Sequence, residues 1–303
     1  MSGFRTFALA GAGGIGTFII WELLKAKAAG TVEKVAILTR PVRKETLQKF
    51  AAAGAVIVPV DYADAHAVKK ALAGVDVVLS TLPIPALDVE LAVAKASRAA
   101  GVKLFVPSEY GLLAITERVT PEKVVNQEKM KAMGLPYTTF FCGPWADTMF
   151  SPYLNLDVAS GKVLVGGDGN RPISSTGRRD VARFVVYALT TLPVETLEYQ
   201  ALNLEGDHKS LNEVVNAYEA KTRKKVEVSY RSIEDLKAAV AANPHDFGAQ
   251  MHLVFALGEG AVGTPDNDLY PDWHPAPIID FLARTDSGDT YRNADSTSAE
   301  YIE

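Results

Sequence analysis

Three glycines near the N-terminus constrain the fold of this chain more than any other feature. Gly11, Gly13 and Gly16 form the pattern G-x-G-x-x-G within TFALAGAGGIGTFIIWELLKA, which begins at Thr6. The apolar run before the glycines predicts a buried strand, and the run after them predicts a helix. In that setting the first glycine permits a tight turn, the second lets a pyrophosphate approach the backbone, and the third lets the helix pack closely on the strand.

The loop is therefore expected to bind a dinucleotide at the start of a helix, where free N–H groups meet negative charge. A flexible bend in an alanine-rich segment is the alternative interpretation. The cofactor-binding residues expected in the loop are Gly11, Ala12, Gly13, Gly14, Ile15 and Gly16.

Apolar runs alternate with helical patterns over the first half of the chain. Six runs without period-two alternation lie at residues 6–11, 34–39, 55–60, 76–81, 103–108 and 137–142. Such runs suit strands that are buried on both faces. Helical spacing of apolar residues separates several of them, at 43–54, 64–75 and 85–102. This order predicts an α/β fold of the Rossmann type, with a doubly wound parallel sheet.

The regular alternation fades after about Gly143. We expect residues 1–150 to form an NADP-binding Rossmann domain to which some later segments return, and residues 151–283 to form a smaller α/β substrate-binding region. Within this region Ser210 and Glu213 have the spacing of a helix capping box. Residues 284–303 are polar and lack periodicity, which predicts a loosely ordered tail.

Composition and charge narrow the partners. The 303 residues carry a net charge of −5 and contain no long run of Lys or Arg, which argues against nucleic acid and anionic membranes as partners. No apolar stretch approaches the roughly 20 residues that span a bilayer. We expect a cytoplasmic protein with a small-molecule partner, and a homodimer is compatible with the sequence.

Cysteine and histidine usage argues against a disulfide framework or a metal site. The single cysteine, Cys142, lies in an apolar run and is expected to be a small buried hydrophobe rather than a nucleophile. Four histidines are scattered without carboxylates at metal-ligand spacing: His66, His208, His245 and His274.

The end of the second predicted strand indicates which dinucleotide binds. An acidic residue there would favour NAD, but the sequence has LTRPVRK. Arg40, with Arg43, Lys44 or Lys49 nearby, offers cationic donors to a 2′-phosphate, so NADP (NADPH) is expected. A solvated basic loop is the alternative.

Later residues provide further candidates for the cofactor cleft. Asp61 would reach the adenine edge, whereas Asp64 is expected to cap the next helix. Thr81, Leu82 and Ser108 follow predicted strands and would form walls of the cleft.

The proton donor of a classical short-chain dehydrogenase is missing. No tyrosine in the chain has a lysine four residues later. Tyr110 in PSEYG is one substitute. The aromatic segment FCGPWADTMFSPYL supplies Trp145, Met149, Phe150 and Tyr153, which would either wall a substrate pocket or join the two regions.

From Thr6 to about Ala283 the chain resembles a known group of atypical short-chain reductases. The similar segments are AGAGGIG, PSEYG, GLPYTTF, GDGNRPISSTGRRDVARF, LNEVVNAYEAKTRKKVE, HLVFALGEG and LYPDW. The group is the isoflavone reductase and phenylcoumaran benzylic ether reductase type, within the wider NmrA-like family.

This resemblance implies roles for particular residues. The family's catalytic lysine lies thirteen residues before a proline, which places it at Lys123, also beside the cofactor. A lysine in a half-apolar cleft should exchange protons readily. A surface lysine is the alternative. The family often has an arginine four residues later, where this chain has Gln127. Its cofactor arginine and lysine match Arg40 and Lys49.

The resemblance also places His252 beside the substrate, although a lone histidine among apolar residues is often a core residue. The resulting hypothesis is an NADPH-dependent oxidoreductase that transfers hydride to an aromatic or conjugated small molecule of secondary metabolism. The alternatives are a non-catalytic NADP-binding sensor and a non-redox isomerase or cyclase on the same fold.

Overall fold

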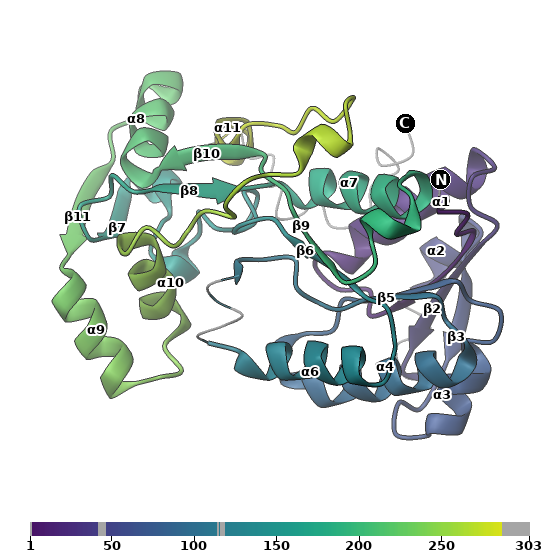
Figure 1. The fold of residues 1–303 in the computed structure, drawn as a ribbon. Helices are drawn as coiled ribbons and strands as arrows, with labels where there is room; N and C mark the ends of the chain where they lie inside the picture. The colour runs from purple at the N-terminus through teal and green to yellow at the C-terminus, as the bar shows by residue number, and fades with distance from the viewer. Residues whose placement is uncertain (1, 42–46, 114, 116–118, 287–303) are drawn as a thin grey trace.

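The central sheet of the molecule has five parallel strands in the order β3-β2-β1-β4-β5. It is seen in a computed structural model that describes residues 2–41, 47–113, 115 and 119–286 (Figure 1). Because the strand order reverses direction beside β1, the predicted doubly wound Rossmann-type sheet is confirmed. The strands are β1 (Thr6–Ala10), β2 (Lys34–Thr39), β3 (Val56–Pro59), β4 (Val77–Ser80) and β5 (Leu104–Val106).

Two further strands extend this layer. β6 (Thr138–Phe141) pairs in parallel with β9 (Gln200–Asn203), and a parallel bridge between Phe105 and Tyr137 joins β6 to β5. All six predicted N-terminal strands therefore form. β9 comes from the second half of the chain, so a later segment does return to the first layer.

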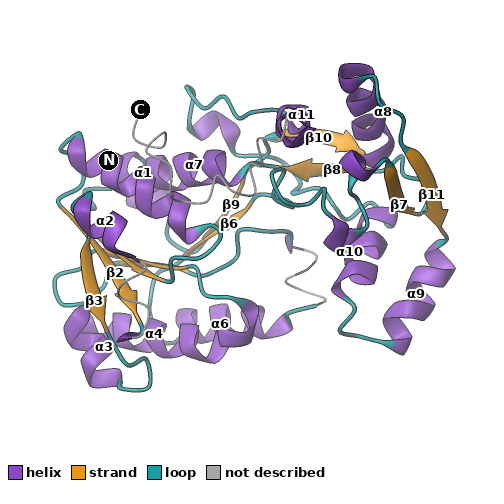
Figure 2. Cartoon of the chain, turned by 180° about the vertical axis from the view of Figure 1, so that it is seen from behind, coloured by secondary structure: helices purple, strands orange, loops and turns teal. Residues whose placement is uncertain are grey.

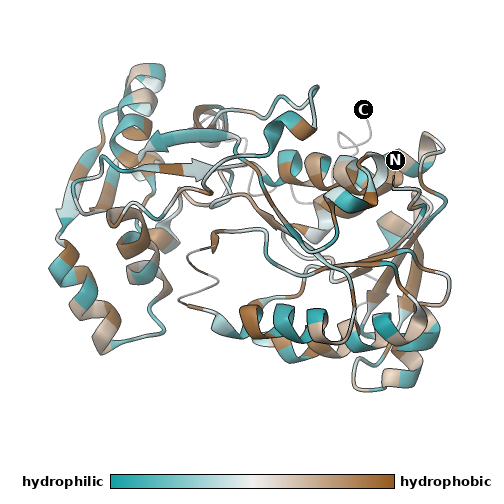
Figure 3. Cartoon of the chain, viewed as in Figure 1, coloured by the Kyte–Doolittle hydropathy of each residue, from teal (hydrophilic) through white to brown (hydrophobic). Residues whose placement is uncertain are grey.

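Helices cover both faces of the sheet. On one face lie α1 (Gly16–Ala28) and α7 (Arg178–Thr191), and on the other lie α3 (Ala65–Ala71), α4 (Leu87–Ala100) and α6 (Pro121–Ala132) (Figure 2). α2 (Gln48–Ala52) is a short helix between β2 and β3. Hydrophobic residues run along the strands between these layers (Figure 3).

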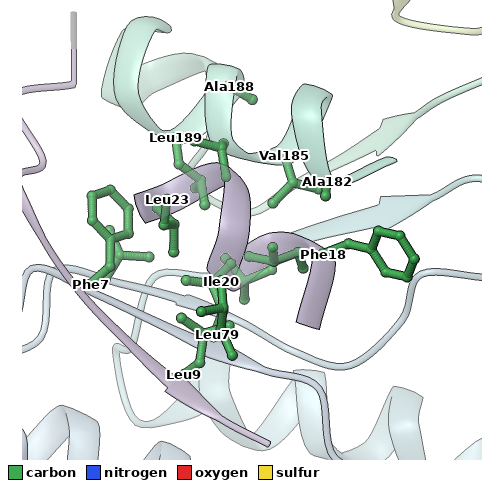
Figure 4. Packing of buried hydrophobic residues seen from close by; sticks show 14 of the residues in the cluster. Phe7, Leu9, Phe18, Ile20, Leu23, Leu79, Ala182, Val185, Ala188 and Leu189 are labelled. Carbon is green, nitrogen blue, oxygen red and sulfur yellow. The ribbon is translucent and has the colours of Figure 1, made fainter. Parts of the chain in front are cut away.

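The alternation of side chains along β1 explains why the two faces differ. Phe7 and Leu9 point toward α1, where Phe7 lies beside Leu23, and α7 lies beyond that helix (Figure 4). Ala8, which lies between them in the strand, points to the other face of the sheet and belongs to the hydrophobic cluster under α3 and α4. Large side chains thus fill one face, while alanine lets helices approach the other. Each large apolar side chain buried in this way contributes about 1.5–3 kcal/mol.

The second region has two small sheets. β7 (Lys162–Gly166) pairs in parallel with β11 (Glu227–Arg231), and β8 (Pro172–Ser175) pairs antiparallel with β10 (Asp207–Ser210). The helices of this region are α8 (Leu211–Thr222), α9 (Ile233–Ala242), α10 (Phe247–Ala256) and α11 (Ile278–Asp286). Short 3-10 helices occur at η2 (Ile84–Ala86), η3 (Pro152–Leu154), η4 (Val158–Ser160), η5 (Val194–Thr196) and η6 (Asn267–Leu269).

Local signals in the sequence set several of these boundaries. Ser210 Oγ accepts from the Glu213 amide at 3.2 Å, and the Glu213 carboxylate accepts from the Ser210 amide at 2.8 Å, so the predicted capping box forms. Of the predicted tail, residues 284–286 belong to α11, and residues 287–303 lie outside the described residues.

A segment near the C-terminus connects the two regions. Trp273 is buried against α7, where its indole N–H donates to the Asp180 carbonyl at 3.0 Å. Asp266 accepts from the Asn203 amide of β9 at 2.8 Å. The segment thus packs on α7 and β9, which lie beyond residue 150 in the sequence but against the first sheet in space.

Cys142 lies at the end of β6 and is fully buried. Burial raises the pKa of its thiol far above the usual range, which suppresses the reactive thiolate. Over the described residues, none of the helices has both the length and the apolar character required to cross a membrane.

Candidate functional site

The glycine loop between β1 and α1 is shaped by steric requirements at its first and third glycines. Gly11 has a φ of +107°, and a Cβ there would lie 2.9 Å from Thr81 Oγ1. A Cβ at Gly16 would collide with the same Thr81 atom and would lie 2.9 Å from the Gly11 carbonyl oxygen. Both positions therefore require glycine for the fold itself.

The second glycine of the loop differs from the other two. A Cβ built at Gly13 would meet no atom within 4 Å, and Gly13 and Gly14 are exposed. Ile15 turns inward and is buried. The loop thus presents open backbone at the head of α1, which fits a group such as a pyrophosphate that binds backbone N–H groups.

A cleft of about 280 Å³ adjoins this loop at the carboxyl ends of β1, β2 and β4. It contains several of the predicted residues, and its lining consists of Gly11, Ala12, Gly13, Leu38, Thr39, Arg40, Leu47, Tyr62, Thr81, Leu82 and Pro83. Arg40 is exposed at this cleft, where a guanidinium can bind an anionic group.

Tyr62 is a wall residue that the sequence analysis did not identify. Its hydroxyl donates to the Leu38 carbonyl at 2.9 Å, and burial raises its pKa to about 12. The hydroxyl is therefore protonated and already used as a donor. Tyr62 follows Asp61 directly beyond the third strand, and this position in the sequence could have indicated that it lines the cleft.

Other predicted cofactor residues lie elsewhere. In the part of the chain that the structure describes, Lys49, Asp61 and Ser108 do not line the cleft. Lys49 Nζ lies 5.1 Å from the centroid of the Phe50 ring. The Asp61 carboxylate accepts from the Ala63 amide at 3.0 Å. Arg43 and Lys44 lie outside the described residues.

Asp64 has the role that the sequence predicted for it. Its carboxylate accepts from the amides of His66 and Ala67, at 2.9 and 3.0 Å, and so caps α3. The capping prediction is confirmed.

Lys123 lies in the first turn of α6 and is buried. Its Nζ donates to the Ser108 carbonyl and lies 3.2 Å from Glu109 Oε2. One helical turn later, the Gln127 side-chain amide donates to Glu109 Oε1 at 2.8 Å. The surroundings of this lysine are therefore not the half-apolar ones expected from the sequence, because a carboxylate lies beside it.

A second acid approaches the same backbone from α4. Glu90 is 1% exposed and accepts from the Ser108 amide at 2.8 Å. Burial raises the pKa of this carboxyl, against the opposing effects of its hydrogen bonds and of Lys123. Ser108 is thus held through its N–H by Glu90 and through its carbonyl by Lys123.

An apolar pocket of about 350 Å³ opens directly beyond this turn. Tyr110, next after Glu109, has an unusual φ of +29° and lines the pocket. The Trp145 indole N–H donates to the Tyr110 carbonyl at 2.9 Å. Apolar side chains dominate the lining, which consists of Tyr110, Gly111, Leu112, Ile115, Gly143, Pro144, Trp145, Thr148, Met149, Ser151, Tyr153, Leu154, Phe247 and Met251.

The pocket brings together some of the predicted substrate residues. Tyr110, Trp145 and Met149 line it, and Tyr153, 72% exposed, stacks on Phe247 with ring centroids 6.3 Å apart. Phe150 is instead buried in the core of the second region, and it is not among the described residues of the lining.

His252 also lies behind the pocket wall. Its Nε2 is 2.8 Å from the Leu154 carbonyl oxygen, and Nδ1 has no hydrogen-bond partner among the described residues. Burial lowers the pKa of the imidazole. Phe247 and Met251 are the described residues of α10 that line the pocket, and His252 is not among them.

Arg178 and Asp147 join the glycine loop to the pocket wall. Arg178 Nε lies 2.6 Å from Asp147 Oδ2, and Nη1 lies 3.4 Å from the Gly14 carbonyl oxygen. Its guanidinium carbon lies 4.9 Å from the centroid of the Phe18 ring and 5.6 Å from that of Trp145. The residues occur in WADTMF and GRRD, but only the fold reveals that they meet.

Comparison with known proteins places these features in context. Residues 6–301 match the model of the NmrA-like family. The chain is 27% identical to isoflavone reductase homolog P3 of Arabidopsis thaliana, over 92% of this chain and 97% of that protein. It is 29% identical to isoflavone reductase of Cicer arietinum, over 88% and 94% of the two chains.

The fold is also similar to that of a solved reductase. Leucoanthocyanidin reductase of Vitis vinifera, in a binary complex with NADPH, superimposes with a TM-score of 0.79 at 22% identity. The similarity covers 93% of this chain and 99% of that one.

Proposed function

The chain belongs to the NmrA-like family, and from this premise we propose that it is an NADPH-dependent reductase of an aromatic or conjugated small molecule, of secondary-metabolite type. The relatives named above are an isoflavone reductase homolog and an isoflavone reductase, and a solved neighbour is a reductase in complex with NADPH. These similarities support the class of reaction, and the site supports its details.

One observation carries the proposal. Lys123 and an apolar pocket meet at three consecutive residues, because the Ser108 carbonyl and the Glu109 carboxylate hold the lysine and Tyr110 lines the pocket. Among the described residues Lys123 itself does not line the pocket, but Nζ is held by the two residues that directly precede the pocket residue Tyr110. The cavity suits an uncharged, flat molecule, and Nζ beside it could supply a proton.

The residues of the cleft fit the dinucleotide. The open backbone at Gly13 would hold the pyrophosphate, and Arg40 would hold the 2′-phosphate. Thr81 and Leu82 would wall the side toward the reacting ring. When bound, NADPH supplies a hydride to an electron-poor carbon of the substrate.

This chain's own residues would manage the rest of the reaction. The apolar pocket excludes water and orients the substrate. Lys123 Nζ would donate a proton to the substrate atom on which negative charge develops, which neutralises the product.

The test is substrate-dependent oxidation of NADPH. The loss of NADPH absorbance would be measured with each compound of a panel of enones, quinones and benzylic ethers. Lys123→Ala should reduce turnover by about 10²–10⁴-fold, the usual contribution of a positioned acid or base. Lys129→Ala is the matched control, because Lys129 is exposed on the same helix. NADPH affinity should be unchanged in both variants.

A cofactor-binding sensor is the second candidate function. Gln127 stands where the resemblance places an arginine near the cofactor, and its amide is directed to Glu109. Tight NADPH binding with no oxidation by any compound in the panel would favour the sensor. Conversion of a substrate without consumption of NADPH would favour an isomerase or cyclase.

A further inference from the structure

We propose that Glu109 is a positioning residue that fixes the orientation of the Lys123 ammonium through a buried ion pair. This inference rests on the proposed function for its effect on catalysis. Glu109 was not identified from the sequence, although it lies within PSEYG.

Both carboxylate oxygens of Glu109 are held by side chains of α6. Oε2 faces Lys123 Nζ at 3.2 Å, and Oε1 accepts from the Gln127 amide at 2.8 Å. Because the two donors are four residues apart on α6, they present adjacent points on one face of the helix. The carboxylate is therefore held against rotation, and its charge stays beside the lysine.

Both members of the ion pair are buried. The side chains of Glu109 and Lys123 are 1% and 10% exposed. A buried carboxylate is strongly disfavoured unless a cation or several hydrogen bonds compensate it, and the same holds for a buried ammonium. The pair is screened little by solvent, so each charge compensates the burial of the other.

Among the described residues, the hydrogen bonds of the Lys123 ammonium leave one N–H donor for a ligand. Lysine has three N–H donors, and Lys123 directs two of them to the Ser108 carbonyl and Glu109. The remaining donor can serve a ligand. Fixing two donors fixes the direction of the third, so Glu109 would position the acid without touching the substrate.

The surrounding groups make a charge at this point consequential. Among the described residues, Glu90 on α4 and Tyr110 after β5 are titratable groups near the pair, and burial raises the pKa of both. If the charge of Glu109 is removed, neither Glu90 nor Tyr110 replaces Glu109 as the ion-pair partner of Lys123.

The first test is Glu109→Gln, which keeps the shape of the side chain and removes its charge. We expect kcat to fall by about 10-fold or more, as for a misplaced catalytic group, with unchanged NADPH affinity. Glu109→Asp should restore part of the loss. Glu122→Gln is the matched control, because Glu122 is exposed beside Lys123 in α6 and should leave kcat unchanged.

The second test does not depend on turnover. Acetic anhydride modifies amines that are not held in a buried ion pair, so peptide mass spectrometry can compare acetylation of Lys123 with that of the exposed Lys129 in the same sample. In Glu109→Gln the Lys123 to Lys129 ratio should rise several-fold over the unmodified chain. Gln127→Leu should raise it less, and it provides the same test if Glu109→Gln does not fold.

The outcomes separate the two proposals. Normal kcat and an unchanged acetylation ratio in Glu109→Gln would overturn the role of Glu109, while an inactive Lys123→Ala would leave the reductase intact. Failure of the unmodified chain to oxidise NADPH with any substrate would overturn the reductase, and the acetylation ratio would still decide the role of Glu109.

Discussion

At the scale of single residues, Arg40 provides a direct test of the cofactor's identity. It is exposed in the cleft at the end of β2, where a cation can bind a 2′-phosphate. Arg40→Ala should weaken NADPH binding by roughly 10- to 100-fold, since hydrogen bonds to charged groups contribute about 1.5–3 kcal/mol. NADH, which lacks this phosphate, should be affected by about twofold or less.

Titration of both dinucleotides by fluorescence or calorimetry would measure this difference. Arg5→Ala is a suitable control, because Arg5 is exposed just before β1, at the opposite end of the strand, and pairs with Glu33. Equal weakening of NADPH and NADH in Arg40→Ala would contradict a phosphate-binding role.

Individual residues differ in how well the sequence predicted them. The glycines and the Asp64 cap were predictable because their physical requirements are local in the chain. Lys123 could be placed only by resemblance. Glu109 and Gln127, which form a hydrogen bond beside Lys123, are separated by 18 residues, so no local sequence pattern could predict their contact.

At the scale of elements, helix α4 contains a polar residue on its buried face. Burial raises the pKa of the Glu90 carboxyl in the folded state, so the native state binds the carboxyl proton more tightly than the unfolded chain does. The stabilisation is fully present below the unfolded pKa and is lost as the pH rises through the folded pKa. The folded protein therefore bears a growing cost from this group above the ordinary value of 4.5.

Glu90→Gln should remove that cost, because an amide oxygen can still accept from Ser108 and carries no charge. We expect the melting temperature to rise at about pH 8 by a few degrees, and to change little at about pH 4. Thermal unfolding at the two pH values would measure it, with exposed Asp88→Asn in the same helix as the control. A lower melting temperature at the higher pH would refute this account.

The elements of the first half were predictable because buried parallel strands read as continuous apolar runs. β1 to β6 all form within the predicted segments. The pocket was only partly predictable. Trp145 and Met149 come from one segment, but Phe247 and Met251 come from α10, about a hundred residues later. Their meeting depends on how the second region folds back.

At the scale of the whole molecule, the segment around Trp273 ties the C-terminal part of the chain to α7. The indole is 5% exposed, and its ring centroid lies 5.2 Å from that of Phe184. Trp273→Ala should lower the free energy of unfolding by about 3–5 kcal/mol, as for other large buried aromatic residues. Chemical denaturation would measure this change.

Trp273→Phe separates packing from hydrogen bonding. It keeps an aromatic ring but loses the donor to the Asp180 carbonyl, so we expect a loss of about 1 kcal/mol plus the smaller ring's lost contacts. A Trp273→Ala variant as stable as the unmodified chain would show that the segment contributes little to holding the two regions together.

The buried thiol at the end of β6 makes this chain a convenient scaffold for spectroscopy. Cys142 is the only cysteine in the sequence, and it is both inaccessible and held protonated. A maleimide dye would therefore react with an engineered surface cysteine without prior removal of the native one. A pair of dyes placed on α3 and α9 would report, by energy transfer in solution, how the distance between the two regions responds to NADPH.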